Sequence, residues 1–350
     1  MGQTTGFAQD KDRRLRAAVK PSGSFYLRSH APRLSLSILE SAPDPRSESP
    51  SLDAEEGPAT PAGHRSGYVA LVGRPNAGKS TLLNALVGRK LSIVTPKPQT
   101  TRHRVLGLLS TDDYQVVLLD TPGLLAPRYG LQERMMQTVR ETTAEADLVL
   151  LMADATHPVD EHGLAALGGQ PALLVLNKID LLSQNEVLPL AEKYAAAHAF
   201  EEIIPISALK GFNLDRLLSL VVARMPLGPA YYPKDQISEH PERFFVAELI
   251  REQIFKQLRQ EVPYATQVNV VNYEEREAPD KDLIDAEIVV ERPTQKGILI
   301  GAKGETLKRI GTYARREIEA FLDRPVFLRL FVKVRDDWRN NDTFLNQYGY

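Results

Sequence analysis

Hydrophobic positions follow two different patterns along the chain, and the first lies between residues 67 and 228. Short apolar runs alternate there with segments of helical character. Apolar runs of this length between helices predict buried parallel strands. Such strands form a doubly wound α/β sheet whose ligand lies at their carboxyl ends. The predicted strands are Tyr68–Val72, Gln115–Leu119, Leu148–Met152, Ala172–Leu176 and Ile203–Ile206.

The second pattern begins after residue 241 and predicts a small α+β domain. A helical repeat of apolar residues comes first, and two stretches that alternate as strands do come next. A segment with several glycines, an amphipathic helix and a last alternating strand complete the order. These elements are Phe244–Leu258, Ala265–Val271, Leu283–Val290, Gly297–Gly304, a helix that ends near Leu322, and Val326–Val334.

Residues 1–66 show neither pattern. The stretch Ser41–Gly63 is dense in Pro, Ser, Ala and acidic residues and has no aromatic residue, which predicts a disordered extension. Two interpretations of the extension remain open: a dispensable tail or misplaced start codon, and an organelle-targeting peptide. We predict the other boundaries as 67–228 for the first domain, 229–240 for a linker, 241–335 for the second domain and 336–350 for a C-terminal tail.

Composition narrows the classes of function. The 350 residues include 43 Lys and Arg against 45 Asp and Glu, and a net charge of -2 excludes a uniformly basic nucleic-acid coat. The chain has no cysteine, which excludes disulfides, thiolate metal sites and a cysteine nucleophile. No apolar run approaches the roughly 20 residues of a transmembrane helix.

A phosphate-binding loop follows the first predicted strand. Gly73–Ser80 reads G-x-x-x-x-G-K-S between a strand and a helix, which is the required context of a P-loop. Its glycines let backbone N–H groups surround phosphate oxygens, and the following helix adds partial positive charge. Lys79 is predicted to reach the β- and γ-phosphates, and Ser80 to bind Mg²⁺. The predicted nucleotide contacts here are Gly73, Asn76, Ala77, Gly78, Lys79, Ser80 and Thr81.

Two further motifs end predicted strands. Asp120-Thr121-Pro122-Gly123 places Asp120 to hold Mg²⁺ through water and the Gly123 N–H to sense the γ-phosphate. Asn177-Lys178-Ile179-Asp180 places a carboxylate, Asp180, that can accept both the ring N–H and the amine of guanine. Adenine lacks that donor pair, so the motif predicts guanine specificity.

The same motif assigns roles to its other side chains. Lys178 is predicted to lay its stem along the base, and Asn177 to bond the P-loop. A last tripeptide, Ser207-Ala208-Leu209, follows the fifth predicted strand, and its backbone N–H groups can meet the guanine carbonyl oxygen.

These four elements in this order resemble those of the translation-factor-related GTPases. The residues of the P-loop and of Pro98–Arg102 resemble the Era branch of that class. The resemblance implies hydrolysis of GTP to GDP with Mg²⁺. It also implies that Thr101 is the switch threonine that closes on Mg²⁺, and that Lys79, Thr101 and Gly123 serve catalysis. Ras-like enzymes place a water-orienting Gln directly after the glycine of the second motif. This chain has Leu124 there.

Some relatives in this branch replace the missing glutamine with a potassium ion, held by the P-loop asparagine and by switch carbonyls. The resemblance assigns this potassium site to Asn76, with Thr95 and Lys97 as the carbonyl donors.

The second domain resembles a KH domain of the bacterial topology, type II. Its Ile-Gly-x-x-Gly segment, Ile300–Gly304, matches the loop that clamps about four nucleotides of single-stranded RNA. Residues 292–316 contain seven basic residues and one acidic residue, a charge of +6 in a chain of -2. The predicted RNA contacts are Lys296, Ile300, Gly301, Ala302, Lys303, Gly304, Lys308 and Arg309.

A GTPase domain followed by a KH domain is the Era architecture, and the resemblance covers roughly residues 67–334. It implies a monomeric switch that binds the 3′ end of 16S ribosomal RNA, acts in 30S subunit assembly, and hydrolyses GTP faster with RNA. The implied location is the cytoplasm, with peripheral association at the inner face of the cell membrane, or the plastid stroma if residues 1–66 are a transit peptide.

Two alternatives remain. One is an RNA-binding assembly scaffold with GTP as a structural ligand, which Leu124 keeps open. The other is a tRNA-modification GTPase, which is disfavoured because such enzymes carry a C-terminal cysteine.

Overall fold

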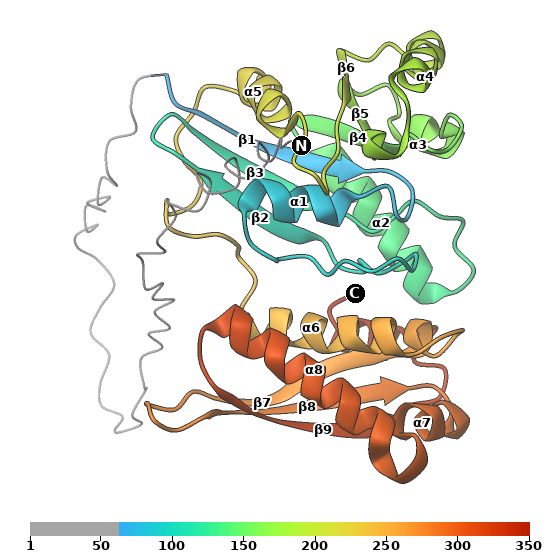
Figure 1. The fold of residues 1–350 in the computed structure, drawn as a ribbon, viewed down its shortest axis with the longest axis vertical. Coiled ribbons are helices and arrows are strands. Elements are labelled where there is room, and N and C mark those ends of the chain that lie inside the picture. Colours follow the sequence, from blue (N-terminus) through green and yellow to red (C-terminus); the bar gives the residue numbers. More distant parts are fainter. Residues whose placement is uncertain (1–62) are drawn as a thin grey trace, which may run out of the picture. The chain divides into compact units, whose positions relative to one another are not determined.

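The computed structural model describes residues 63–350, apart from the side chain of Gln184, and these residues belong to one compact unit (Figure 1). The predictions for residues 1–62 lie outside the described residues. Within residues 63–350, no helix is both long enough and apolar enough to cross a bilayer.

The first half of the described chain forms one six-stranded sheet in the order β2-β3-β1-β4-β5-β6. The five predicted strands are confirmed and run parallel to one another. Their bounds are β1 Arg65–Val72, β3 Tyr114–Asp120, β4 Leu148–Asp154, β5 Ala172–Asn177 and β6 Glu202–Pro205. The first strand therefore already includes two residues of the predicted extension.

Strand β2, Val105–Ser110, is an antiparallel edge strand that the hydrophobic pattern does not predict. Gly107 interrupts its apolar run. A Cβ at this position would lie 2.8 Å from Leu83 Cδ1, so the glycine lets helix α1, Lys79–Val87, pack closely on the strand. The residue that weakens the strand signal is thus the one that the packing requires.

Helices cover both faces of this sheet (Figure 1). On one face, Leu82 of α1 and Leu217 of α5 share an apolar cluster with β1, β3 and β4. On the other face, Met135 of α2 and Tyr194 of α4 share an apolar cluster with the alternate residues of β1 and β4 and with residues of β5. The remaining bounds are α2 Gly130–Glu145, α3 Glu161–Ala166, the 3₁₀ turn η1 Ile179–Leu181, α4 Gln184–Ala197 and α5 Leu214–Arg224.

The second half contains a three-stranded sheet in the order β7-β8-β9, with β7 antiparallel and β9 parallel to β8. Ile254 of α6 and Ile310 of α8 belong to the apolar cluster that buries one face of this sheet. The bounds are α6 Glu242–Gln257, η2 Pro263–Ala265, β7 Gln267–Glu274, β8 Asp282–Val290, α7 Pro293–Ile300, η3 Ala302–Gly304, α8 Glu305–Leu322 and β9 Val326–Val334.

Helix α7 is not predicted by the sequence pattern, because Gly297 lies in its middle. It begins with Pro293 at its first position, where proline is favoured. The Gln295 carboxamide accepts the Arg292 N–H at 3.1 Å and so satisfies a backbone donor at the helix start. The helix therefore leads directly into the Ile300–Gly304 loop.

The predicted linker, residues 229–240, contains no helix or strand but lies along the first sheet. Ser238 Oγ donates to the Leu106 carbonyl at 2.6 Å, and the Leu108 N–H donates to the Ile237 carbonyl at 3.0 Å. The C-terminal tail forms the helix α9, Asp342–Gln347. Trp338, the single tryptophan, is fully buried, and its indole N–H donates to the Ala265 carbonyl at 3.0 Å.

Candidate functional site: a nucleotide pocket and an RNA cleft

The P-loop follows β1 directly and adopts a conformation that requires glycine. Gly78 has φ +99°, and a Cβ there would lie 2.1 Å from Asn177 Nδ2. Gly73 has φ +149°, and a Cβ there would lie 2.2 Å from the Met152 carbonyl oxygen. Both glycines are therefore needed for the loop to fit between the ends of β4 and β5.

Asn177 joins three of the predicted motifs. Its Nδ2 donates to the Ala77 carbonyl at 2.8 Å, as the sequence predicts, and its Oδ1 accepts the Ala208 N–H at 2.9 Å. The carboxamide is buried, so neither bond competes with water. The P-loop, the Asn177–Asp180 motif and the 207–209 loop therefore meet at one edge of the sheet.

The predicted base-reading groups lie beside this junction. Asp180 is exposed in the turn η1, and its carboxylate has no hydrogen bond or ion pair with any residue of 63–350. Lys178 Nζ lies 2.6 Å from Asp154 Oδ2, which holds the lysine at the end of β4. Ser207 is buried and Leu209 is 76% exposed. A free carboxylate at this edge is available for two donors of a base.

Lys79 is buried within the P-loop. Its ammonium donates to the Gly73 carbonyl at 2.9 Å and to the Arg74 carbonyl at 3.0 Å. Desolvation lowers the pKa of Lys79 to about 8, although the negative charges of Asp120 and Asp160 oppose the shift. A buried cation held only by carbonyls is poorly compensated, so an anion entering the loop would find a strong partner.

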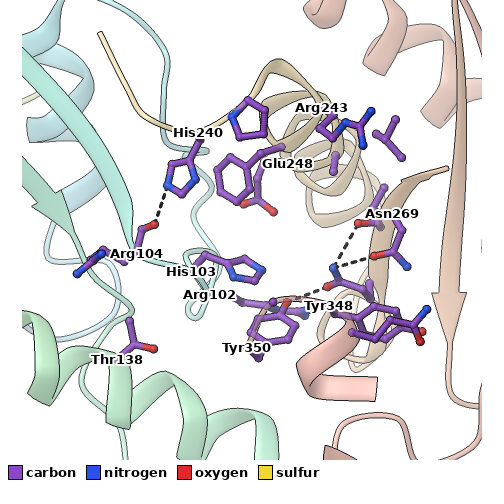
Figure 2. Close-up of a pocket in the computed structure, with 18 of the residues that line it drawn as sticks. Arg102, His103, Arg104, Thr138, His240, Arg243, Glu248, Asn269, Tyr348 and Tyr350 are labelled. Carbon is purple, nitrogen blue, oxygen red and sulfur yellow. Dashed lines mark hydrogen bonds between the residues drawn. The ribbon is translucent and has the colours of Figure 1, made fainter. Parts of the chain in front are cut away.

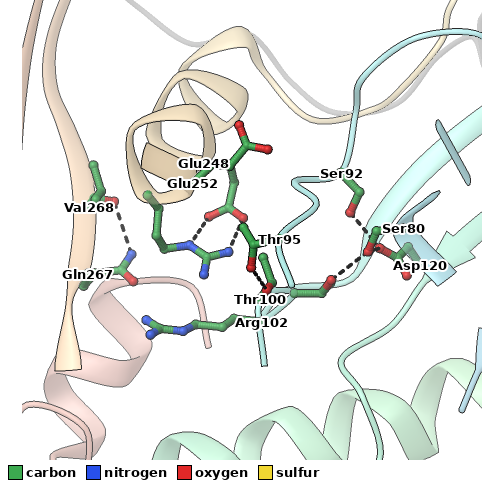
Figure 3. Close-up of polar contacts among 12 residues, drawn as sticks. Ser80, Ser92, Thr95, Thr100, Arg102, Asp120, Glu248, Glu252, Gln267 and Val268 are labelled. Atoms are coloured by element: carbon green, nitrogen blue, oxygen red, sulfur yellow. Dashed lines mark hydrogen bonds and ion pairs between the residues drawn. The ribbon is translucent and has the colours of Figure 1, made fainter. Parts of the chain in front are cut away.

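A cluster of side-chain oxygens surrounds Asp120, whose charge acts on Lys79. Figure 3 shows Ser80, Ser92 and Asp120 of this cluster. Asp120 Oδ2 accepts from Ser80 Oγ and from Ser92 Oγ, both at 2.6 Å, and Ser80 Oγ lies 2.9 Å from Thr101 Oγ1. Burial raises the pKa of Asp120, and the Lys79 charge opposes this rise. The other carboxylate oxygen, Asp120 Oδ1, is buried without a hydrogen-bond partner.

These groups fit Mg²⁺, which prefers hard oxygen ligands from hydroxyls, carboxylates and water. The unpartnered Asp120 Oδ1 is the observation that supports the fit, because a buried acceptor is costly unless a donor or cation satisfies it. Ser80, Thr101 and Asp120, the three predicted ligands, lie together. Ser92 belongs to no motif, and its role is visible only in the folded chain.

Leu124, which directly follows the Asp120–Gly123 motif, has apolar surroundings in the structure. Gly123 lies against the P-loop, since a Cβ there would be 2.6 Å from the Pro75 nitrogen. The Leu124 N–H donates to the Gly73 carbonyl at 3.0 Å, and its side chain packs on an apolar cluster. No side chain at position 124 is therefore available to orient a water molecule.

The structure brings Asn76 of the predicted potassium site close to the backbone that carries the other two predicted residues, Thr95 and Lys97. Asn76 Nδ2 donates to the Pro96 carbonyl at 3.0 Å, so the carboxamide reaches the backbone between Thr95 and Lys97. The Lys97 carbonyl accepts from Thr100 Oγ1 at 2.8 Å. A cation bound there would therefore compete with the threonine hydroxyl for this carbonyl.

A cleft of about 590 Å³ lies between α8 and β9 in the second domain. Gly304 and Lys308, both predicted, are among its lining residues. A Cβ at Gly311 would lie 3.3 Å from Leu330 Cδ1, so this glycine lets the helix approach the strand. Residues that line the cleft without having been predicted include Lys281, Leu307, Gly311, Arg315, Leu328 and Leu330.

The glycine loop stands at one end of this cleft. Gly301 and Gly304 have φ values of +74° and +79°, and Lys303 also has a positive φ, 50°. Ala302 and Lys303 are exposed at the loop tip, whereas Arg309 donates to Gln257 Oε1 of α6 at 2.9 Å. An exposed, tightly turned loop next to a cleft lined by both apolar and basic side chains has the form of a clamp for a phosphate backbone and its bases.

The site therefore belongs to a P-loop GTPase joined to a KH domain. Comparison with known families agrees: residues 68–178 match the model of the 50S ribosome-binding GTPases, and residues 261–339 match that of the KH domain.

The chain belongs to the Era family of GTPases. It is 49% identical over 304 residues to the chloroplastic GTPase ERA1 of Zea mays, a match that covers 85% of this chain and 73% of the relative. An Era variant of Aquifex aeolicus bound to GDP and aluminium fluoride matches with a TM-score of 0.79 and 41% identity, over 82% of this chain and 99% of that one. Era bound to MgGDPNP and nucleotides 1506–1542 of 16S ribosomal RNA matches with a TM-score of 0.79 and 40% identity, with the same coverage.

The depressed pKa of Lys79 makes GTP binding pH-dependent. Because its pKa in the free chain is about 8, the lysine is mostly neutral at pH 8.5, and the phosphate charge should protonate it on binding. We expect GTP binding to take up roughly 0.7 proton more at pH 8.5 than at pH 7, where the lysine is already charged. Calorimetric titration in two buffers of different ionisation enthalpy measures this uptake. Equal uptake at both pH values would contradict the lowered pKa of Lys79 in the free chain.

Proposed function

We propose that this Era-family GTPase binds the 3′ end of small-subunit ribosomal RNA and acts as a GTP-dependent switch in assembly of that subunit. The observation that carries the proposal is the glycine loop beside the α8–β9 cleft, in a chain whose match to the RNA-bound Era covers both domains. The cleft supplies apolar surface for bases, and Lys308 beside it supplies charge.

The large ribosomal subunit is the competing target, because the matching GTPase family is described as 50S-binding. That match covers residues 68–178 only, whereas the match to the structure with 16S RNA covers 82% of the chain. The wider match includes the α8–β9 cleft, which is the element suited to RNA. We therefore favour the small subunit.

Within the nucleotide site, the chain's own groups account for binding and orientation. Lys79 and the P-loop N–H groups hold the β- and γ-phosphates, and Asp180 takes the guanine edge. Mg²⁺, when bound by Ser80, Thr101 and Asp120, supplies positive charge to the phosphates. In this proposal, Thr101 and the Gly123 N–H report whether a γ-phosphate is present. The apolar Leu124 leaves charge stabilisation in the transition state to other groups.

The RNA prediction is tested with a double substitution in the loop. Replacing Ala302 and Lys303 by Asp places negative charge where the phosphate backbone passes, and each lost phosphate contact removes part of the salt-dependent affinity. We expect a roughly tenfold or greater loss of affinity for a 16S 3′-end fragment in filter binding at fixed salt. GTP affinity and RNA-independent hydrolysis should stay unchanged, and stimulation by RNA should disappear.

The matched control for this experiment is Lys193→Asp with Ala196→Asp, an equal change of charge on the exposed surface of α4. A loop variant that binds the 16S fragment like the control, or a wild type that prefers a 23S fragment, would overturn the proposed target.

We also propose that a potassium ion held through Asn76 assists hydrolysis. The support is the reach of Asn76 to the backbone of residues 95–97, together with the apolar Leu124. Hydrolysis should be several-fold faster in potassium than in sodium at equal ionic strength, and Asn76→Ala should abolish the difference. Phosphate release measured in the two salts decides the point, and equal wild-type rates would refute the cation site.

For the location we propose the plastid stroma, because a relative 49% identical to this chain is chloroplastic. The transit peptide would then lie ahead of β1, within residues 1–64. A fusion of these residues to a fluorescent protein should enter isolated chloroplasts and be shortened there, whereas the fluorescent protein alone should not. A fusion that stays outside at full length would favour the cytoplasmic alternative.

A further inference from the structure

The segment that carries Thr101 is fastened to the KH domain by three cations, Lys90, Lys97 and Arg102. Lys90 Nζ lies 2.7 Å from Glu252 Oε2 of α6 and 2.7 Å from Glu317 Oε2 of α8. We call residues 90–103 the switch segment. Lys97 Nζ donates to the carbonyls of Phe255 and Leu258, where helix α6 ends. Five residues further on, the Arg102 guanidinium donates to carbonyls of the η2 turn region. Cations are favoured at helix C-termini because the last carbonyls there have no partner within the helix.

The three hydrogen bonds that Arg102 donates to the η2 region all go to backbone carbonyls. Its Nη1 donates to the Thr266 carbonyl at 2.7 Å, and its Nη2 donates to those of Tyr264 and Pro263 at 3.0 and 3.1 Å. The residue is 3% exposed, and desolvation lowers its pKa. Only a planar guanidinium presents donors in the fork that reaches three acceptors at once.

The acceptors of Arg102 are themselves rigid. Thr266 Oγ1 donates to the Val262 carbonyl at 2.7 Å, and Thr266 is fully buried. The Ala265 carbonyl takes the indole N–H of Trp338, which belongs to the C-terminal tail. The hydrogen bonds from Thr266 and from Trp338 hold this turn in place, so its carbonyls can fix the position of the guanidinium.

His103, which follows Arg102 on the C-terminal side of Thr101, also contacts the C-terminal tail (Figure 2). The His103 ring stacks on the Tyr350 ring at a centroid distance of 4.2 Å, and Tyr350 Oη donates to Gln267 Oε1 of β7 at 2.8 Å. A cavity of about 920 Å³ opens beside these rings, lined by residues of the switch segment, α2, α6, β7 and the tail. Side chains on both sides of Thr101 therefore contact the second domain or its tail: Lys97 on the N-terminal side, and Arg102 and His103 on the C-terminal side.

We propose that Arg102 is a positioning residue for GTP hydrolysis. Its three hydrogen bonds to the η2 region hold Thr101 beside Ser80 and Asp120, where Mg²⁺ would bind. The inference rests on the proposed function. Thr101 Oγ1 lies 2.9 Å from Ser80 Oγ, and the next residue in the chain is the anchored arginine. The KH domain thus supplies part of the scaffold of the nucleotide site, and a disturbance of the η2 turn would reach Thr101 through Arg102.

The Arg102→Ala substitution should impair GTP hydrolysis and leave GDP binding nearly unchanged. GDP has no γ-phosphate for the Thr101 region to sense, so its affinity should stay within about twofold of wild type, a free-energy change of about 0.4 kcal/mol. The kcat for GTP should fall at least tenfold, and the Mg²⁺ concentration for half-maximal rate should rise. Arg102→Lys keeps the charge without the fork and should recover only a small part of kcat.

The control is Arg104→Ala, two residues further on, because Arg104 pairs with Glu145 at the surface, at 3.2 Å. Its kcat, Mg²⁺ dependence and GDP affinity should match wild type. Arg102→Gln keeps one planar amide donor and serves if the alanine variant does not fold, as judged by thermal melting.

A folded Arg102→Ala or Arg102→Gln variant with wild-type kcat would overturn the inference, as would an equal loss of GDP and GTP affinity, which indicates a purely structural role. A wild-type chain without GTP hydrolysis would instead refute the proposed function.

Discussion

The buried carboxylate of Asp120 is the constraint around which the nucleotide site is organised. A carboxylate removed from water is costly unless donors or cations surround it. Ser80 and Ser92 supply two short hydrogen bonds and Lys79 supplies charge, so the start of α1 and the switch segment must both converge on the end of β3. One oxygen remains unpartnered, and the cluster keeps an acceptor for a cation.

Buried cations in this chain are held in contrasting ways. The Lys79 ammonium donates to two P-loop carbonyls, and burial lowers its pKa. Phosphate oxygens would be stronger acceptors for this ammonium than the carbonyls are. Arg102 fills three carbonyls that belong to another domain, and no ligand is needed to complete its contacts. Arg251 pairs with Glu248, and this pairing lowers the pKa of the glutamate despite its burial. The first cation is suited to binding, and the other two are suited to holding the structure together.

Glycines decide how closely the functional elements approach one another. Gly78 makes room for Asn177, which then bonds the P-loop and the 207–209 loop at once. In the second domain, Gly311 lets α8 approach β9 and shapes the cleft beside the glycine loop. A methyl group at Gly78 would displace the Asn177 carboxamide, whereas one at Gly311 would require a small shift of the Leu330 side chain.

Much of this protein is determined locally by its sequence. The five parallel strands, the P-loop, the Asn177–Asp180 motif and the Ile300–Gly304 loop are each encoded by residues close together in the chain, so their patterns are visible without the fold. Helix α7 and strand β2 are not visible, because Gly297 and Gly107 interrupt their patterns. Glycine has a low propensity for the interior of a helix or a strand, so local sequence does not indicate either element.

Only the tertiary structure decides the contacts between distant residues. Ser92 reaches Asp120 across 28 positions, Arg102 reaches Thr266 across 164, and Trp338 reaches Ala265 across 73. Serine, arginine and tryptophan are ordinary residues at these places in the sequence, and no spacing rule marks them. Their roles arise because burial leaves each of them with a polar group that must find a partner, and the fold determines which partner lies within reach.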